Sequence, residues 1–186
     1  MLLLACANTQ HDTFYEYNTN MNPVEVLIGM GANLGNPEIT FKRAQLLLSS
    51  DLINSKISPL YQTIPVYDKP GSIKPNVPQP MYTNAVMHAY TYWSPQDLLK
   101  RLLEVEKTLG RIRPAPVCSP RHIDLDLLLY GDCIISSTNP DELQLPHPRM
   151  HLREFVLIPA ADIAPDMVHP GLNKTIKELL EQLSAP

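Results

Sequence analysis

Asp124 and Asp126 stand two residues apart in an apolar stretch that runs from Ile123 to Tyr130. In a β-strand, residues i and i+2 project from the same face, so the sequence predicts that the two carboxylates point together. Burying two carboxylates side by side is costly unless cations neutralise them. A hard divalent ion such as Mg²⁺ does this by binding one or two carboxylates together with substrate phosphates. The alternative is a solvated strand end that binds nothing.

Arginines surround this acidic pair in the sequence. Arg111, Arg113 and Arg121 precede it, and Arg149 and Arg153 follow it. Each guanidinium offers a planar fork of donors that matches phosphate oxygens, so the combination indicates a polyphosphate nucleotide bound with Mg²⁺. The chain has no Walker A sequence and no kinase glycine loop, which excludes the common nucleotide-binding families. An arginine cluster by itself is also typical of a solvated surface.

The helices and strands that must position these residues can be predicted from the periodicity of apolar residues and from helix-capping residues. The order is β-α-β-β-α-β, which predicts an α+β, ferredoxin-like fold with an antiparallel sheet, helices packed on it and long loops at the site. We expect strands over 24–29, 53–61, 83–92 and from Asp124, with an edge strand at 134–135. Helices are expected from Pro37 to about Ser50 after an Asn36 cap, after a capping box at Ser94, over 150–159, and from Thr175 through Leu183.

Two segments lie outside this pattern. Residues 1–22 have no apolar periodicity, and we interpret them as a disordered leader or a start codon placed too early, with residues 23–186 forming a single domain. Residues 66–81 contain four prolines and predict a long loop. Long loops in compact domains are usually functional or disordered.

Composition limits the partners. The net charge is −4 and no long basic run is present, which argues against nucleic acid. No apolar run is long enough to span a membrane. The three cysteines, Cys6, Cys118 and Cys133, form neither a disulfide framework nor a metal motif, and a reducing cytoplasm is expected.

Several motifs together resemble 6-hydroxymethyl-7,8-dihydropterin pyrophosphokinase of folate biosynthesis. The resemblance extends from about Val24 to Leu183. The segments that carry it are Gly29–Gly35, Tyr61–Pro65, Tyr82–Ala85, Glu106 with Gly110–Arg113, Pro120–Asp126, Leu145–Arg149, Arg153–Pro159 and Ile163–Asp166.

This resemblance implies transfer of a diphosphate from ATP to the hydroxymethyl group of the pterin, with release of AMP. It implies that Asp124 and Asp126 hold two Mg²⁺ ions. Pterin-binding residues would be Thr63, Pro65, Val66, Tyr82, Asn84 and Phe155; ATP-binding residues would be Glu106, Arg111, Arg113, Arg121, Ile123, His147 and Arg153, with Arg111 and Arg121 also catalytic. By residue type alone, Phe155 is better explained by core packing and Asn84 by a turn amide.

The chain also departs from the family. Cys118 stands where the family usually has Trp, which implies weaker stacking on the pterin, and Ala32 replaces a usual Ser. A weakened pterin- or nucleotide-binding module of the same fold is the alternative, and an RNA-binding ferredoxin-like domain lacks the expected basic charge. We expect a monomer, or a fusion or association with other folate-pathway enzymes.

Overall fold

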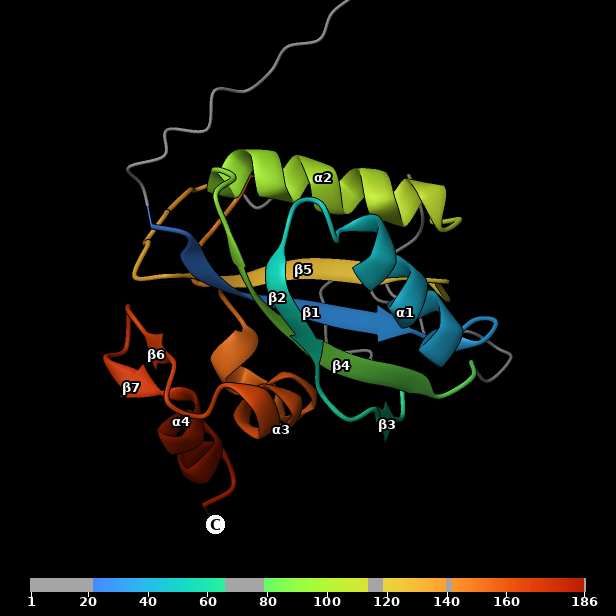
Figure 1. The fold of residues 1–186 in the computed structure, drawn as a ribbon. Coiled ribbons are helices and arrows are strands. Elements are labelled where there is room, and N and C mark those ends of the chain that lie inside the picture. The colour runs from blue at the N-terminus through green and yellow to red at the C-terminus, as the bar shows by residue number, and fades with distance from the viewer. Residues whose placement is uncertain (1–21, 66–78, 114–118, 140–141, 186) are drawn as a thin grey trace, which may run out of the picture.

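A computed structural model describes residues 22–65, 79–113, 119–139 and 142–185 (Figure 1). Residues 1–21 of the predicted leader, most of the predicted 66–81 loop, and Cys118 therefore lie outside the described residues. Among the described residues, no helix is long and apolar enough to cross a membrane. The elements are β1 (Val24–Ala32), α1 (Pro37–Leu47), β2 (Ile53–Ile57), β3 (Tyr61–Thr63), β4 (Tyr82–Thr91), α2 (Pro95–Thr108), β5 (Asp124–Tyr130), a 3₁₀ turn (Met150–Leu152), α3 (Glu154–Ile163), β6 (Val168–His169), β7 (Lys174–Thr175) and α4 (Ile176–Leu183).

The main sheet is antiparallel, in the order β2-β4-β1-β5, with β3 paired to the other end of β4. This order places β1 and β4 in the middle and confirms the ferredoxin-like plan. The predicted extended segment 53–61 is in fact two strands, both on β4. Pro59 stands between them, and a proline cannot donate to a strand ladder.

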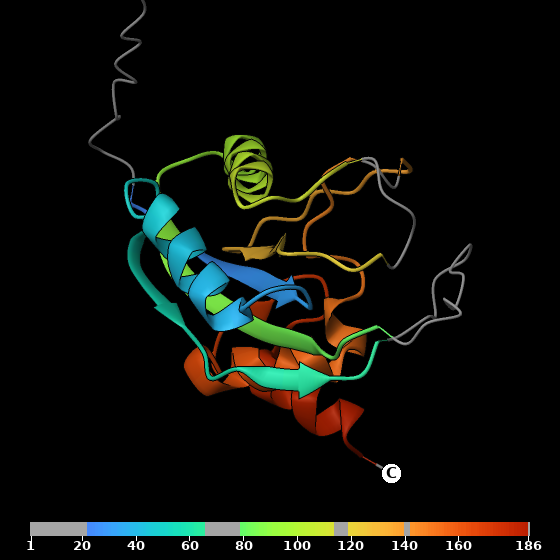
Figure 2. The ribbon, with the colours of Figure 1, turned by 90° about the vertical axis from the view of Figure 1, so that its right-hand side faces the viewer.

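Two cores cover the two faces of the sheet. Val26 and Ile28 of β1 pack beneath α1 and α2, whereas Leu27 packs with α3 and α4 on the opposite face. Alternation of side chains along a strand produces this division. Figure 2 shows α2 on one side of the sheet and the C-terminal helices on the other. The second face is only partly covered, and its open part holds the pocket described below.

Three helices begin at the caps that the sequence predicts. The Asn36 side chain accepts a hydrogen bond from the Ile39 backbone N–H, and Ser94 accepts one from Asp97. Thr175 and Glu178 form a reciprocal capping box. Such caps satisfy backbone donors that the first turn leaves without partners. The first helix ends at Leu47, earlier than expected.

Two predicted elements differ. The expected edge strand at 134–135 is a single bridge between Ile135 and Leu145. The expected helix over 150–159 is a 3₁₀ turn followed by α3, with Arg153 in an extended conformation between them. This break separates Arg153 from the preceding turn and directs it toward the pocket.

Candidate active site

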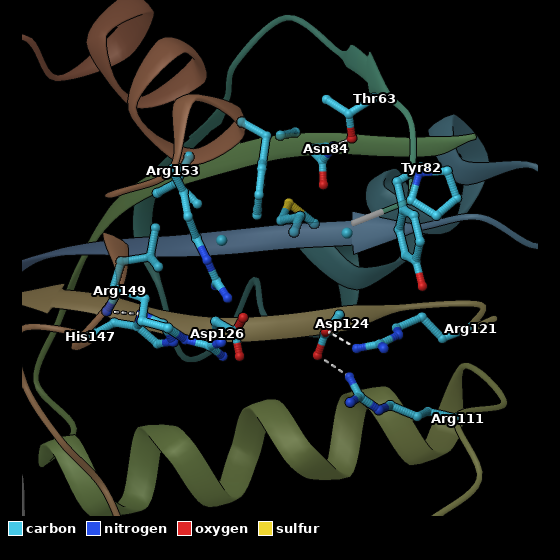
Figure 3. A pocket seen from close by; sticks show the side chains of 18 of the residues that line it. Thr63, Tyr82, Asn84, Arg111, Arg121, Asp124, Asp126, His147, Arg149 and Arg153 are labelled. Atoms are coloured by element: carbon cyan, nitrogen blue, oxygen red, sulfur yellow. Dashed lines mark hydrogen bonds and ion pairs between the residues drawn. The ribbon is translucent and has the colours of Figure 1, made fainter. Parts of the chain in front are cut away.

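A cavity of about 440 Å³ opens on the partly covered face of the sheet. Figure 3 shows polar side chains from several elements converging on it. Its lining includes most of the predicted site residues: Thr63, Pro65, Tyr82, Asn84, Arg111, Arg113, Arg121, Asp124, Asp126, His147, Arg153 and Phe155. It also includes Gly29, Met30, Gly31, Ile64, Ala85, Leu128, Arg149 and Val156, which the site prediction did not contain.

Two glycines of β1 form the floor of the cavity. Gly31 pairs with Asn84 on one side and Asp124 on the other, and Gly29 pairs with Asp126 in the same way. A Cβ atom on Gly31 would lie 3.6 Å from the Asn84 amide oxygen and 3.7 Å from the Asp124 Cβ atom. Glycine therefore leaves open the space between the amide and the carboxylates, where a ligand can approach the backbone.

The two aspartates project from the same face of β5, as their spacing predicts. Both line the cavity, whereas Leu125 between them is buried in the opposite core. Each oxygen of the Asp124 carboxylate accepts a hydrogen bond, one from Arg111 and one from Arg121. Burial opposes ionisation of Asp124, but these two guanidinium groups hold its pKa below the usual range.

Asp126 has the opposite electrostatic environment. Burial, followed by the nearby charge of Asp124, raises its pKa to about 7. Within the described residues, no side chain forms an ion pair with it. The charges of Arg153 and Arg111 only partly offset this pKa shift. A carboxylate without a direct ion pair beside a second carboxylate is a suitable ligand for a hard divalent cation. The oxygen donors of Asp124 and Asp126 therefore fit Mg²⁺.

Asp126 leads to a prediction about stability in Mg²⁺-free buffer. The folded protein retains the Asp126 proton up to about pH 7, whereas the unfolded chain loses it near pH ~4. Unfolding therefore releases a proton between these values, and stability should fall as pH rises through this window. The full loss above pH 7 should be on the order of 2 kcal/mol, because the carboxylate is partly exposed and retains some hydration.

The variant Asp126→Asn should lose this pH dependence. Urea unfolding at several pH values should find it similar to the wild type near pH 4 and more stable at pH 8. Titrating the wild type with Mg²⁺ at pH 8 should recover stability, because the cation binds the ionised carboxylate. Equal slopes of stability against pH in the two proteins would contradict this account of Asp126.

Glu106 lies behind the cavity and orients its arginines. Its side chain is 1 % exposed, and it accepts hydrogen bonds of 2.7 Å each from Arg111, Arg113 and the Leu125 backbone N–H. Burial raises the pKa of Glu106, and the hydrogen bond from Arg113 opposes this shift. Neither Glu106 nor the fully buried Ile123 lines the cavity, although both were predicted as ATP-binding residues. Val66 lies outside the described residues.

Asn33 is a buried connector that the sequence reasoning missed. Its side-chain oxygen accepts a hydrogen bond of 2.8 Å from the Arg121 N–H, and its own N–H donates to the Arg121 carbonyl. Its amide nitrogen donates to the Gln79 side chain and the Pro80 carbonyl. Asn33 thus fixes the segment that carries Arg121 relative to the segment that precedes β4. Its place in the Gly29–Gly35 segment was the available signal.

The other end of the cavity is suited to a flat polar ring. The Asn84 side chain is buried and donates a hydrogen bond of 2.8 Å to the Thr63 hydroxyl, while its oxygen has no donor among the described residues. The Tyr82 hydroxyl donates to the Ser119 carbonyl. The Arg153 guanidinium carbon lies 5.3 Å from the Phe155 ring centre. Aromatic and amide groups in this arrangement can stack on a heterocycle and bind its edge.

Comparisons with known proteins agree with this geometry. The pattern of the 7,8-dihydro-6-hydroxymethylpterin-pyrophosphokinase family matches residues 27–165. A folic acid synthesis protein of Schizosaccharomyces pombe is 33% identical over 177 residues, which are 92% of this chain and 22% of that protein. A 2-amino-4-hydroxy-6-hydroxymethyldihydropteridine pyrophosphokinase of Haemophilus influenzae is 35% identical over 164 residues, 87% of this chain and 94% of that protein.

Other relatives are longer than this chain. The pyrophosphokinase of Synechocystis is 45% identical over 106 residues, 57% of this chain and 52% of its own length. The chain thus spans 22% of the length of the Schizosaccharomyces pombe protein and 52% of the length of the Synechocystis protein. The solved Plasmodium falciparum HPPK-DHPS with pterin and p-hydroxybenzoate shares the fold, with a TM-score of 0.67 at 16% identity over 87% of this chain and 42% of that one. The chain belongs to the 7,8-dihydro-6-hydroxymethylpterin pyrophosphokinase family.

Proposed function

We propose that this chain transfers the diphosphate of ATP to the hydroxymethyl group of 6-hydroxymethyl-7,8-dihydropterin, giving AMP and the pterin diphosphate. The observation that carries the proposal is the convergence of a carboxylate pair, several arginines and an amide-lined pocket in one cavity. The carboxylates and arginines suit a metal-bound polyphosphate, and the amide-lined pocket suits a flat heterocycle. The family match and the relatives' names support the same reaction.

The pterin would lie at the Asn84 end of the cavity. The Asn84 oxygen would accept hydrogen bonds from the ring edge, Phe155 would stack on a ring face, and Thr63, Pro65 and Tyr82 would close the sides. The hydrogen bond from Asn84 to Thr63 fixes the orientation of the amide. The Asn84 side-chain oxygen is therefore already directed toward the ligand before binding. Pre-orientation of this kind favours one edge of the heterocycle over others.

The polyphosphate would lie across Asp124 and Asp126, held by two Mg²⁺ ions and by Arg111, Arg113, Arg121, His147 and Arg153. When bound, the metal supplies Lewis-acid activation and neutralises phosphate charge. The hydroxymethyl oxygen attacks the β-phosphorus as the bond to the bridging oxygen breaks. The electron pair of that bond remains on the α-phosphate of AMP, and the hydroxyl proton is released. The arginines stabilise charge on the transferred and leaving groups.

Pterin-dependent release of AMP tests the proposal. Protein incubated with ATP, Mg²⁺ and the reduced hydroxymethylpterin should produce AMP and pterin diphosphate in equal amounts. Chromatography of the reaction mixture measures both products. Reactions without the pterin, and with GTP in place of ATP, serve as controls for nucleotide hydrolysis and specificity. Binding of both substrates without AMP release would instead identify a binding module, and ADP as the nucleotide product would overturn the reaction type.

The setting of the reaction is also a proposal. We place the protein in the cytoplasm because its cysteines lack a disulfide pattern, and we propose that residues 23–186 act as one monomeric domain. The names of relatives include a folate synthesis bifunctional protein of Arabidopsis thaliana. Association or fusion with another folate-pathway enzyme is therefore part of the proposal, and analytical ultracentrifugation would test the monomer.

A further inference from the structure

Arg149 lines the cavity but has no part in the function described so far. It lies just before the 3₁₀ turn Met150–Leu152, close in the chain to His147, whose backbone N–H donates a hydrogen bond of 2.8 Å to the Leu128 carbonyl of β5. Met150, the next residue, is fully buried in the core beneath α3 and α4. Arg149 is therefore attached to a turn that is fixed on both sides.

Arg149 differs from three other arginines of the cavity, whose charges are neutralised by ion pairs. Arg111, Arg113 and Arg121 each form ion pairs with Glu106 or Asp124. Arg149 is half-buried at the cavity and forms no ion pair with any carboxylate of the described residues. A partly buried cation without a counter-charge favours binding of an anion.

His147 adds a second donor beside it. The Nδ1 atom of His147 accepts a hydrogen bond of 3.2 Å from the Arg149 backbone N–H. A neutral imidazole that accepts at Nδ1 carries its proton on Nε2, so its other nitrogen is a donor. His147 and Arg149 thus place two donor groups at the same end of the cavity (Figure 3).

The strand register gives the position of this end relative to the pterin pocket. Asn84 and Asp124 both pair with Gly31, whereas Asp126 pairs with Gly29, two residues earlier on β1. In Figure 3, Thr63, Asn84 and Tyr82 gather toward the Asp124 end of the carboxylate pair, and His147 and Arg149 lie at the Asp126 end. Arg149 is therefore on the far side of the carboxylates from the pocket suited to the heterocycle.

We propose that Arg149 binds the α-phosphate of the nucleotide and of the AMP product, an inference that rests on the proposed function. In an in-line displacement, the attacking and leaving oxygens lie on opposite sides of the phosphorus. With the hydroxymethyl group at the Asp124 end, the oxygen that leaves with AMP faces the Asp126 end. When the bond between the β-phosphorus and this bridging oxygen breaks, the electron pair stays on AMP, and Arg149 neutralises the added negative charge.

Calorimetric titration with AMP tests this position, because AMP carries only the α-phosphate. Arg149→Ala should weaken binding of AMP, and of ATP in Mg²⁺ without pterin, by roughly tenfold or more, as expected for a charge-assisted hydrogen bond. Arg149→Lys should recover part of the affinity. Arg121→Ala, at the Asp124 end, should weaken ATP binding and leave AMP binding nearly unchanged. The exposed Arg43 on α1 provides a matched control, and Arg43→Ala should bind both nucleotides like the wild type.

Two results would overturn the assignment. One is unchanged affinity for both nucleotides in Arg149→Ala, which would make Arg149 a solvated residue at the rim. The other is weaker ATP binding with unchanged AMP binding, which would place Arg149 at the β- or γ-phosphate. Failure of the proposed function is distinguishable from both, because it would be seen in the wild-type protein, as absence of pterin-dependent AMP release, whereas the two results above compare nucleotide affinities of the variant and the wild type.

Discussion

Replacing Asp126 or Asp124 by alanine is expected to lower turnover by roughly 1,000-fold or more, the scale of several kcal/mol of lost transition-state stabilisation. Each substitution removes a carboxylate that faces the cavity and that we propose as a Mg²⁺ ligand. Neither side chain belongs to the hydrophobic cores, so the variants should remain folded. Asp126→Ala should even be more stable than the wild type in Mg²⁺-free buffer at pH 8, since it removes a carboxylate that burial and Asp124 disfavour.

The assay for both variants is AMP release at saturating ATP and Mg²⁺, with circular dichroism as the check on folding. Asp132, exposed just after β5, offers a matched control, and Asp132→Ala should keep wild-type activity. Activity within tenfold of the wild type in either Asp124→Ala or Asp126→Ala would mean that the carboxylate pair does not hold the metal. An unfolded variant would show instead that the pair is needed for stability.

Glu106→Ala is expected to be the most destabilising substitution at the site. The buried carboxylate accepts from two arginines and the Leu125 N–H, so its removal leaves two guanidinium groups without their buried partner. Breaking a buried ion pair in this way costs about 3 to 5 kcal/mol. Turnover should also fall by roughly 100-fold, because Arg111 and Arg113 lose the group that orients them. Urea unfolding and AMP release measure the two effects.

Two further variants separate the role of Glu106 from a general effect on α2. Glu106→Gln keeps an oxygen for Arg111 and Leu125 but presents an amide N–H to Arg113, so it should lose about 1 to 2 kcal/mol. Glu104 lies on the same helix with a side chain that is 67% exposed and pairs with Arg101 at 3.4 Å. Glu104→Ala should cost less than about 1 kcal/mol, as surface ion pairs do. Similar losses in Glu104→Ala and Glu106→Ala would refute the special role of Glu106.

The sequence alone determined the features that depend on neighbouring residues. Because side chains alternate between the two faces of a strand, the spacing of Asp124 and Asp126 predicted a common face. In the structure both line the cavity. The caps at Asn36, Ser94 and Thr175 were also predictable, because a cap needs only a side chain and a backbone N–H within the same turn. The order of the predicted elements indicated the antiparallel fold, and the motifs together identified the family.

Only the tertiary structure decided which distant residues share the cavity. The strand predicted over 24–29 in fact extends to Ala32, so Gly31 as well as Gly29 belongs to β1, where pairing with β4 and β5 makes both glycines the floor between Asn84 and the aspartates. Glu106 was predicted to bind ATP, yet α2 packs it behind Arg111. The placement of Arg149 likewise depends on the hydrogen bond that the nearby His147 N–H makes to Leu128 of β5. These relations come from strand register and helix packing between segments far apart in the chain. The spacing of residues within one segment does not determine which segments pair.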